Sequence, residues 1–157
     1  MNEQTVEKLK SLRLPGFVEA LLEQRVCDAY HDMSFEERLA FLVEKELLRR
    51  ENQKLNTRIK AARFKVPASI DQIDFKASRG LEKKRVLELA QGGWLAAYHN
   101  LVIVGPTGVG KTFLATALAH HLCKNGATVL YIKTNDLVAM LQNARADGSF
   151  KVTYSRL

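Results

Sequence analysis

The sequence predicts an α/β fold, in which an N-terminal helical domain is followed by an incomplete α/β domain. The first part of the chain has no Gly or Pro between Gly16 and Pro67, which favours long helices. Further on, the apolar run at residues 101–104 is followed by GPTGVGKT at residues 105–112 and then by an Ala- and Leu-rich stretch. Strand, glycine-rich loop and helix in this order are typical of a phosphate-binding α/β unit.

The N-terminal domain is predicted to contain two short helices and one long one. Pro15 and Gly16 predict a break between the short helices. Ser34 and Glu37 form the S-x-x-E pattern of a capping box, so a helix of about 30 residues is expected to begin there and to end before Pro67. Its apolar positions change sides near residues 47–48. Either the helix bends at this point, or its two halves pack on different neighbours.

The division into domains follows from these signals. Residues 1–65 form the basic helical domain, residues 66–80 a linker, and residues 81–157 the start of the α/β domain. The linker contains Ile70, Ile73 and Phe75 between polar residues, and so we expect it to pack on the domain that follows.

The α/β domain is predicted to contain three helices and two strands. Helices are expected over residues 81–90 and 113–124, and a third one, carrying the apolar residues 137–141, with Asn135 as its N-cap. Gly126 lies where a C-terminal glycine would end the second of these helices. The strands are expected at residues 101–104 and 128–132, and a turn at residues 147–148.

The glycine-rich loop has the complete G-x-x-x-x-G-K-[ST] pattern, known as a Walker A motif or P-loop. Its glycines let the backbone come close to phosphates, and its N–H groups form an anion nest at the start of a helix. Lys111 is expected to reach the β- and γ-phosphates, and the Thr112 hydroxyl to bind Mg²⁺. The alternative is a chance match, which the flanking sequence disfavours. The residues predicted to bind the nucleotide are Gly105, Pro106, Thr107, Gly108, Val109, Gly110, Lys111 and Thr112.

A concentrated run of basic residues ends the N-terminal domain. Residues 49–65 hold seven basic side chains and a single acid, Glu51, in a chain whose net charge is +7. Such a segment is either a solvated helix face or a contact for a polyanion, most commonly nucleic acid. The residues predicted to contact DNA are Arg49, Arg50, Lys54, Arg58, Lys60, Arg63 and Lys65.

Other protein classes find little support in the sequence. No apolar stretch reaches the ~20 residues of a membrane helix, and the polar N-terminus lacks the apolar core of a signal peptide. We therefore expect a cytoplasmic protein without a membrane partner. Cys27 and Cys123 are isolated in sequence, so free thiols are expected, and the histidines form no metal-binding pattern.

Two long segments resemble the IstB family of transposition helper proteins, which are AAA+ ATPases. They are ELLRRENQKLNTRIKAARFKVPASIDQIDF and NLVIVGPTGVGKTFLATALAHHLCKNGATVLYIKTNDLV, and the likeness covers essentially the whole chain. The basic helix joined to the IDQIDF stretch points to this family rather than to P-loop proteins at large. The helicase loader DnaC is similar in architecture.

The resemblance implies an ATP- and Mg²⁺-binding protein that self-assembles on DNA and directs a transposase to its target. It also places Phe75 and its neighbours near the adenine. Family members continue for roughly a hundred residues with a Walker B acid, sensor residues and an arginine finger. We therefore expect a C-terminally truncated form with impaired ATP hydrolysis, in which no catalytic set is complete.

The same resemblance predicts a difficulty in folding. In the AAA+ sheet the strand order is 5-1-4-3-2, so that the two strands expected here are not neighbours. Their unpaired backbone groups would be costly, and the second domain is not expected to be well formed alone. Two alternatives to a transposition helper stay open: a helicase loader similar to DnaC, and a non-catalytic DNA-binding or interfering fragment. A small-molecule kinase is disfavoured, because such enzymes place the loop near the start of the chain.

Overall fold

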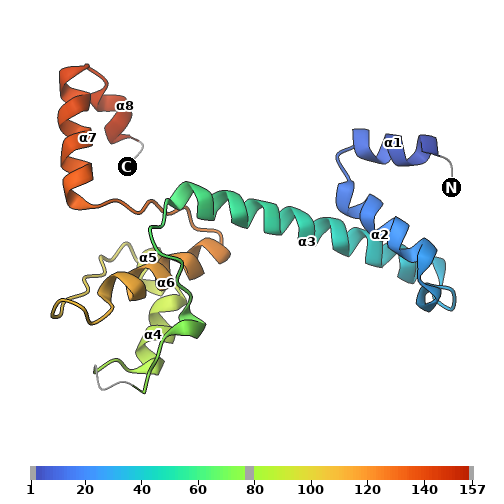
Figure 1. Ribbon diagram of the computed structural model, residues 1–157, viewed down its shortest axis with the longest axis horizontal. Coiled ribbons are helices and arrows are strands. Elements are labelled where there is room, and N and C mark those ends of the chain that lie inside the picture. The colour runs from blue at the N-terminus through green and yellow to red at the C-terminus, as the bar shows by residue number, and fades with distance from the viewer. Residues whose placement is uncertain (1–2, 77–79, 156–157) are drawn as a thin grey trace. The chain divides into compact units, whose positions relative to one another are not determined.

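The computed structural model describes residues 3–76 and 80–155, and the chain divides into two compact units (Figure 1). The N-terminal unit is Met1–Asn56 and the C-terminal unit is Thr57–Leu157. The helices of the described residues are α1 (Glu3–Ser11), α2 (Pro15–Val26), η1 (Asp28–Tyr30), α3 (Phe35–Ala62), η2 (Ile70–Gln72), α4 (Lys83–Ala90), α5 (Gly93–Ala96), α6 (Lys111–Lys124), α7 (Thr134–Ala146) and α8 (Phe150–Tyr154).

The predicted α/β fold class is wrong. Residues 3–76 and 80–155 contain helices and irregular segments but no β-strand, and both predicted strands, at residues 101–104 and 128–132, are irregular. A strand is stable only when its N–H and C=O groups pair with another strand, and these two segments do not pair with each other. Val102 and Val104 are 77% and 87% exposed. The N–H of Tyr131 donates instead to the carbonyl of Ala62, at the end of α3, over 2.8 Å.

In the N-terminal unit, a buried carboxylate joins α2 to α3. Glu46 Oε2 accepts hydrogen bonds from the backbone N–H groups of Gly16 (2.8 Å) and Phe17 (3.2 Å), in the first turn of α2. Its other oxygen accepts a bond from Arg50 Nε at 2.7 Å. The N–H groups at a helix start lack intrahelical partners, and a negative charge there also interacts favourably with the helix dipole. Glu46 therefore serves as the N-terminal cap of α2.

The two helices can approach because residue 16 is glycine. A Cβ atom at this position would lie 3.0 Å from both Arg49 Cδ and Glu46 Oε2, and 3.1 Å from the carbonyl oxygen of Lys45. Any larger residue would push α2 away from α3 and lengthen the hydrogen bonds to Glu46. The prediction of a helix break at residues 15–16 is confirmed, since α2 begins at Pro15.

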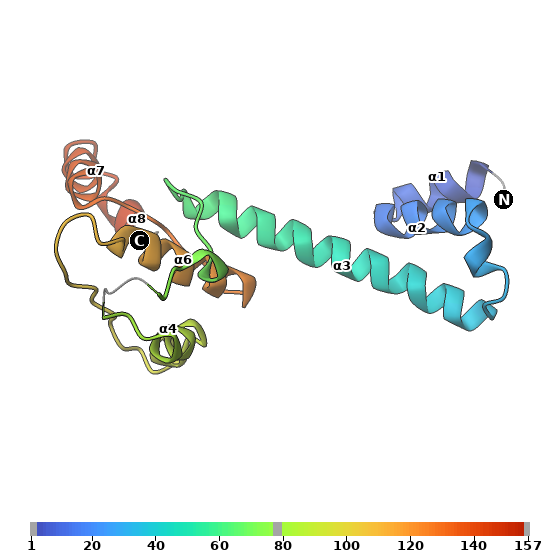
Figure 2. The same cartoon turned by 60° about the horizontal axis from the view of Figure 1, so that its bottom comes forward.

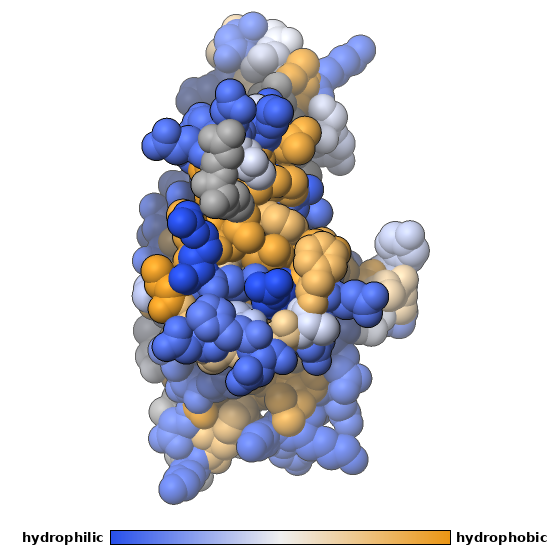
Figure 3. Space-filling view, turned by 90° about the vertical axis from the view of Figure 1, so that its right-hand side faces the viewer, coloured by the Kyte–Doolittle hydropathy of each residue, from blue (hydrophilic) through white to orange (hydrophobic). Residues whose placement is uncertain are grey.

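The apolar core of the N-terminal unit is small. Val18, Ala20 and Leu42 are its buried apolar side chains among the described residues. In a space-filling view, hydrophobic surface lies open between hydrophilic side chains (Figure 3). The large apolar side chains of this unit that are exposed are Leu12, Leu22, Val26, Phe35, Leu39, Val43, Leu47 and Leu48. With so little buried apolar surface, polar contacts such as those of Glu46 matter more to the stability of this unit.

The long helix α3 begins as the sequence predicts. Ser34 N–H donates to Glu37 Oε2 at 2.8 Å, and Glu37 N–H donates to Ser34 Oγ at 3.2 Å, so the capping box is confirmed. Figure 2 shows α3 as one uninterrupted helix. Its residues up to Asn56 belong to the N-terminal unit and its last residues to the C-terminal unit, so the two parts of the helix have different neighbours.

The core of the C-terminal unit lies between α4 and α6. Val86 and Ala90 of α4 pack with Leu118 of α6, and all three are nearly fully buried. Partly buried apolar side chains surround them, among them Ile70, Ile73, Phe75, Leu81, Leu89, Leu101 and Leu114. Segment 70–75 thus lies against the core, while residues 77–79 of the predicted linker are outside the described residues.

Several local predictions for this unit can be compared with the structure. Gly126 follows α6 with φ +99°, and the Ala127 N–H donates to the Leu122 carbonyl at 3.0 Å, so the C-terminal glycine is confirmed. The prediction that Asn135 is an N-cap is wrong, because α7 already begins at Thr134, with Lys133 as its N-cap. The sequence did not predict α5 or α8, since each is too short to show a clear period.

Replacing Glu46 with Gln is expected to destabilise the N-terminal unit by about 1–2 kcal/mol near neutral pH, because the cap of α2 loses its charge. Burial raises the pKa of Glu46, but its bonds to Arg50, Phe17 and Gly16 outweigh burial and lower the pKa. Because the pKa of Glu46 is lower in the folded state, its ionised carboxylate stabilises the fold at pH values above the pKa of the unfolded state, about 4.3. This stabilisation is lost as the pH falls through the pKa of the folded state. Urea unfolding at several pH values measures the difference.

The exposed Glu44, two residues before Glu46 on α3, supplies the matched control Glu44→Gln. The difference in unfolding free energy between the Glu46→Gln variant and the wild type should shrink toward acid pH, whereas the control should differ little at any pH. Equal losses in both variants, or a Glu46→Gln loss that does not depend on pH, would contradict the proposed cap.

Candidate functional site

The loop of residues 105–112 leads directly into α6. Gly108 and Gly110 have φ values of +86° and +93°, in the region that favours glycine. Gly110 immediately precedes α6, and its carbonyl accepts the first helical bond, from the N–H of Leu114 at 2.9 Å. The N–H groups of the residues just before Leu114 have no acceptor one turn earlier within the helix. The loop therefore ends in a set of backbone donors at the positive end of the α6 dipole.

Lys111, the first residue of α6, folds back over this loop. Its Nζ donates a hydrogen bond to the carbonyl of Pro106, which closes the loop with a positive charge at its opening. Residues 105–109 and Thr112 are exposed, while Gly110 and Lys111 are half-buried. The ammonium group of Lys111 thus lies over the loop, and the exposed Thr112 follows it in the first turn of α6.

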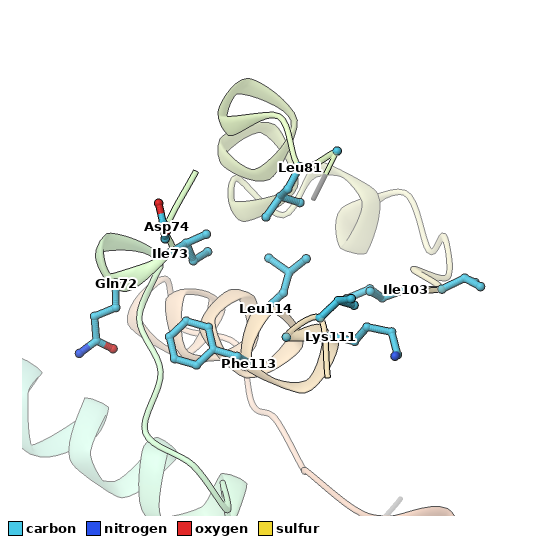
Figure 4. A pocket seen from close by; sticks show the side chains of 12 residues that line it. Gln72, Ile73, Asp74, Leu81, Ile103, Lys111, Phe113 and Leu114 are labelled. Atoms are coloured by element: carbon cyan, nitrogen blue, oxygen red, sulfur yellow. The ribbon is translucent and has the colours of Figure 1, made fainter. Parts of the chain in front are cut away.

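A pocket of about 430 Å³ lies beside the loop. Figure 4 shows Leu81 and Leu114 facing each other across it, with Phe113 and Ile73 toward one end and Lys111 with Ile103 toward the other. The pocket is therefore lined by apolar side chains at one end, where Gln72 and Asp74 add polar groups, and Lys111 brings a positive charge to the end next to the loop. A molecule with an apolar ring system and a chain of anionic groups matches this distribution.

Phe75 and its neighbours, which the resemblance places near an adenine, differ in their position relative to this pocket. Phe75 packs against the core of Val86, Ala90 and Leu118 and does not line the pocket. Its neighbours Ile73 and Asp74 do line it. Sequence reasoning did not single out the other apolar residues of the pocket. Phe113 could have been found, because it directly follows Thr112, whereas Leu81 and Ile103 come from segments whose approach to the loop depends on tertiary packing. The apolar pocket residues not singled out are Leu81, Ile103, Val104, Phe113 and Leu114.

The seven basic residues predicted to contact DNA have different surroundings. Arg50 is bonded to Glu46, and its Nη2 donates to the carbonyl of Arg13 at 3.0 Å. Arg58 Nη1 lies 3.4 Å from the carbonyl of Cys123, in the last turn of α6. Arg50 and Arg58 thus contribute to packing. Arg49 and Arg58 are half-buried. Arg50 is exposed in spite of its contacts, and the other exposed members of the segment are Lys54, Lys60, Arg63 and Lys65.

Three further features concern possible chemistry outside the loop. Cys27 and Cys123 are free thiols, the first exposed and the second buried; burial raises the pKa of Cys123, partly offset by Arg58. Among residues 3–76 and 80–155, no three His, Cys, Asp or Glu side chains gather in a way that could hold a metal ion. In the same residues, no helix is both long and apolar enough to span a membrane.

The loop, its helix and the adjoining pocket define a candidate site for a phosphate-bearing ligand. Comparison with known proteins identifies the family to which the chain belongs. The model of the family described as IstB-like ATP binding protein matches residues 7–157, and the chain belongs to this family. A protein of Pseudomonas fluorescens, named as the ATP-binding protein of insertion sequence IS1162, is 40% identical over 100% of this chain and 68% of its own length.

Other relatives carry similar names. An insertion sequence ATP-binding protein of Sinorhizobium fredii is 36% identical over 93% of this chain and 60% of its own length. The ATP-binding protein named for insertion sequence IS21 in Pseudomonas aeruginosa is 32% identical over 92% of this chain and 54% of its own length. The chain therefore spans between 54% and 68% of the length of these three relatives.

Replacing Gly110 with Ala is expected to strain the start of α6, because a side chain at φ +93° costs about 1–2 kcal/mol. The C-terminal unit should melt at a lower temperature in circular dichroism. Gly93→Ala is the matched control, because Gly93 has no positive φ and no atom within 4 Å of an added Cβ. An equal melting temperature for the two variants would show that the loop does not hold the described conformation.

Proposed function

We propose that this chain binds ATP with Mg²⁺ at the loop of residues 105–112 and acts as a helper protein in DNA transposition. The observation that carries the proposal is the arrangement of Gly108 and Gly110, in left-handed conformations, before a helix that opens with Lys111. Membership of a family of ATP-binding proteins supports it, as do the names of the relatives, which assign them to insertion sequences.

The ligand should lie along the pocket with its phosphates at the loop. The backbone donors of residues 108–112 and the Lys111 ammonium would hold the triphosphate. In its present position the ammonium is bonded to the carbonyl of Pro106, so binding would exchange this bond for one to a phosphate. The apolar end, formed by Ile73, Leu81 and Phe113, would take the adenine ring.

The chain offers one side chain for the magnesium ion. Thr112 is exposed in the first turn of α6, and its hydroxyl would bind Mg²⁺ while the phosphates supply further oxygen ligands. A hard cation with several waters and phosphate ligands needs few protein groups, which fits a site with no carboxylate cluster in the described residues. The ion would neutralise charge on the β- and γ-phosphates.

The role in transposition requires contact with DNA. The exposed side chains of Lys54, Lys60, Arg63 and Lys65 give residues 49–65 a positively charged surface suited to the phosphate backbone. A transposase, and further copies of the chain, would be the protein partners. The names of the relatives, which place them in insertion sequences, support a partner of this kind.

Lys111→Ala is expected to weaken the binding of Mg²⁺·ATP by at least tenfold, because the ammonium group supplies a charge-assisted contact of about 1.5–3 kcal/mol. Isothermal titration with ATP and with a non-hydrolysable analogue measures the loss. Lys124→Ala, at the other end of α6, is the matched control and should bind nearly as tightly as the wild type. Equal affinities of the Lys111 variant and the control would show that the loop does not bind the nucleotide.

Neutralising the exposed Lys54, Lys60 and Lys65 together as Gln is expected to weaken binding to duplex DNA. The slope of log affinity against log salt should become shallower by up to about one unit for each phosphate contact that is lost. Fluorescence anisotropy between about 50 and 200 mM salt gives this slope. The control changes Lys83, Lys84 and Lys151, exposed residues outside the segment, so that the net charge falls equally. Identical slopes for the two sets would argue against a specific DNA contact by this segment.

A further inference from the structure

We infer that the turn between α1 and α2, together with the facing part of α3, forms a pocket that binds a phosphate of a nucleic acid backbone. The pocket has a volume of about 580 Å³ and lies wholly within the N-terminal unit. Four basic side chains line it, Lys10, Arg13, Arg49 and Arg50, with Glu46 as its acidic residue. The inference rests on the proposed DNA contact and extends it to Lys10 and Arg13, which lie outside residues 49–65.

The single carboxylate of the pocket does not balance its positive charge. Glu46 is 7% exposed, and both of its oxygens are engaged, with the N–H groups that begin α2 and with Arg50. Lys10 forms an ion pair with Glu7 at 2.9 Å, but both side chains are more than half exposed. Exposed pairs of this kind contribute little and exchange readily for another anion. The pocket therefore keeps a net positive charge that an anionic ligand could neutralise.

The backbone of Arg13 supplies a second, independent observation. Its φ of +58° is left-handed, at the residue that ends the turn after α1, where glycine is the common choice. The turn is closed by bonds from Arg13 N–H to the Lys10 carbonyl (2.9 Å) and from Leu14 N–H to the Leu9 carbonyl (3.0 Å). Arg50 then holds the Arg13 carbonyl. An arginine at a strained position that glycine would fill more easily points to a function of its side chain.

The surroundings favour a polymer over a single phosphate. The guanidinium groups of Arg13 and Arg49 offer forked donors that match phosphate oxygens. Lys54 is exposed and lies one helical turn beyond Arg50 on α3, so the positive charge continues past the edge of the pocket. A phosphodiester backbone can contact these groups in succession, whereas a free phosphate could contact only those at one point.

The test uses the full 157-residue chain and a DNA duplex of about 20 base pairs, with affinity measured by anisotropy at several salt concentrations. Arg13→Gln should weaken binding about five- to tenfold at 0.1 M salt and reduce the salt slope by about one. Arg13→Gly should weaken it equally without lowering the melting temperature, because glycine relieves the left-handed conformation. The control is Arg25→Gln, an exposed arginine of α2 outside the pocket with the same change of charge.

Each outcome decides the inference. Weaker DNA binding in both Arg13 variants, with the Arg25 control near wild type, supports it. If the Arg13 variants bind DNA as tightly as the control, the inference is overturned. If neutralising Lys54, Lys60 and Lys65 still weakens binding in that case, the proposed DNA contact stands without this pocket. A second result would also overturn the inference. If the duplex binds the wild type and the Arg13→Gln variant equally well, but millimolar inorganic phosphate binds only the wild type, the ligand of the pocket is a small anion.

Discussion

The geometry of the candidate site depends on the packing of α6 against α4. Val86 and Ala90 press on Leu118, and the partly buried Leu114 extends this contact toward the loop. In a complete parallel sheet a strand would fix the loop from its other side, but residues 101–104 are irregular here. The helix pair and the segment of residues 70–75 therefore hold the start of α6 in place. Because Ile73 and Leu81 contact this core and also line the pocket, the same packing shapes the apolar end of the site.

The N-terminal unit depends on a different kind of contact. Its few buried apolar side chains are supplemented by Glu46, which ties the first turn of α2 to Arg50. Arg50 in turn reaches the carbonyl of Arg13, so one basic residue of the predicted DNA-contacting segment takes part in the fold. Arginine side chains can stabilise a turn and still present donors to a phosphate, because the guanidinium group has five N–H donors. Structure and proposed function thus share residues in this unit.

Local signals in the sequence predicted local structure well. The capping box at Ser34, the break at Pro15 and the glycine after α6 are each set by a few adjacent residues, and all three are confirmed. The fold class could not be predicted in this way, because a strand requires a partner that sequence pattern at residues 101–104 cannot supply. For the site, the loop residues follow from the motif. The pocket beside it depends on how Leu81 and Ile73 come near α6, which is a matter of tertiary packing.

The central claim is that the backbone N–H groups of residues 108–112 receive the phosphates of a nucleotide. It is tested most directly by recording the amide signals of the ¹⁵N-labelled chain while Mg²⁺·ATP is added. The account predicts saturable shifts that are largest at Gly108, Gly110, Lys111 and Thr112, with smaller ones at Ile73 and Phe113. Shifts confined to the basic pocket around Arg13 and Arg49, with the loop amides unchanged, would show that ATP binds as a polyanion elsewhere and would contradict the account.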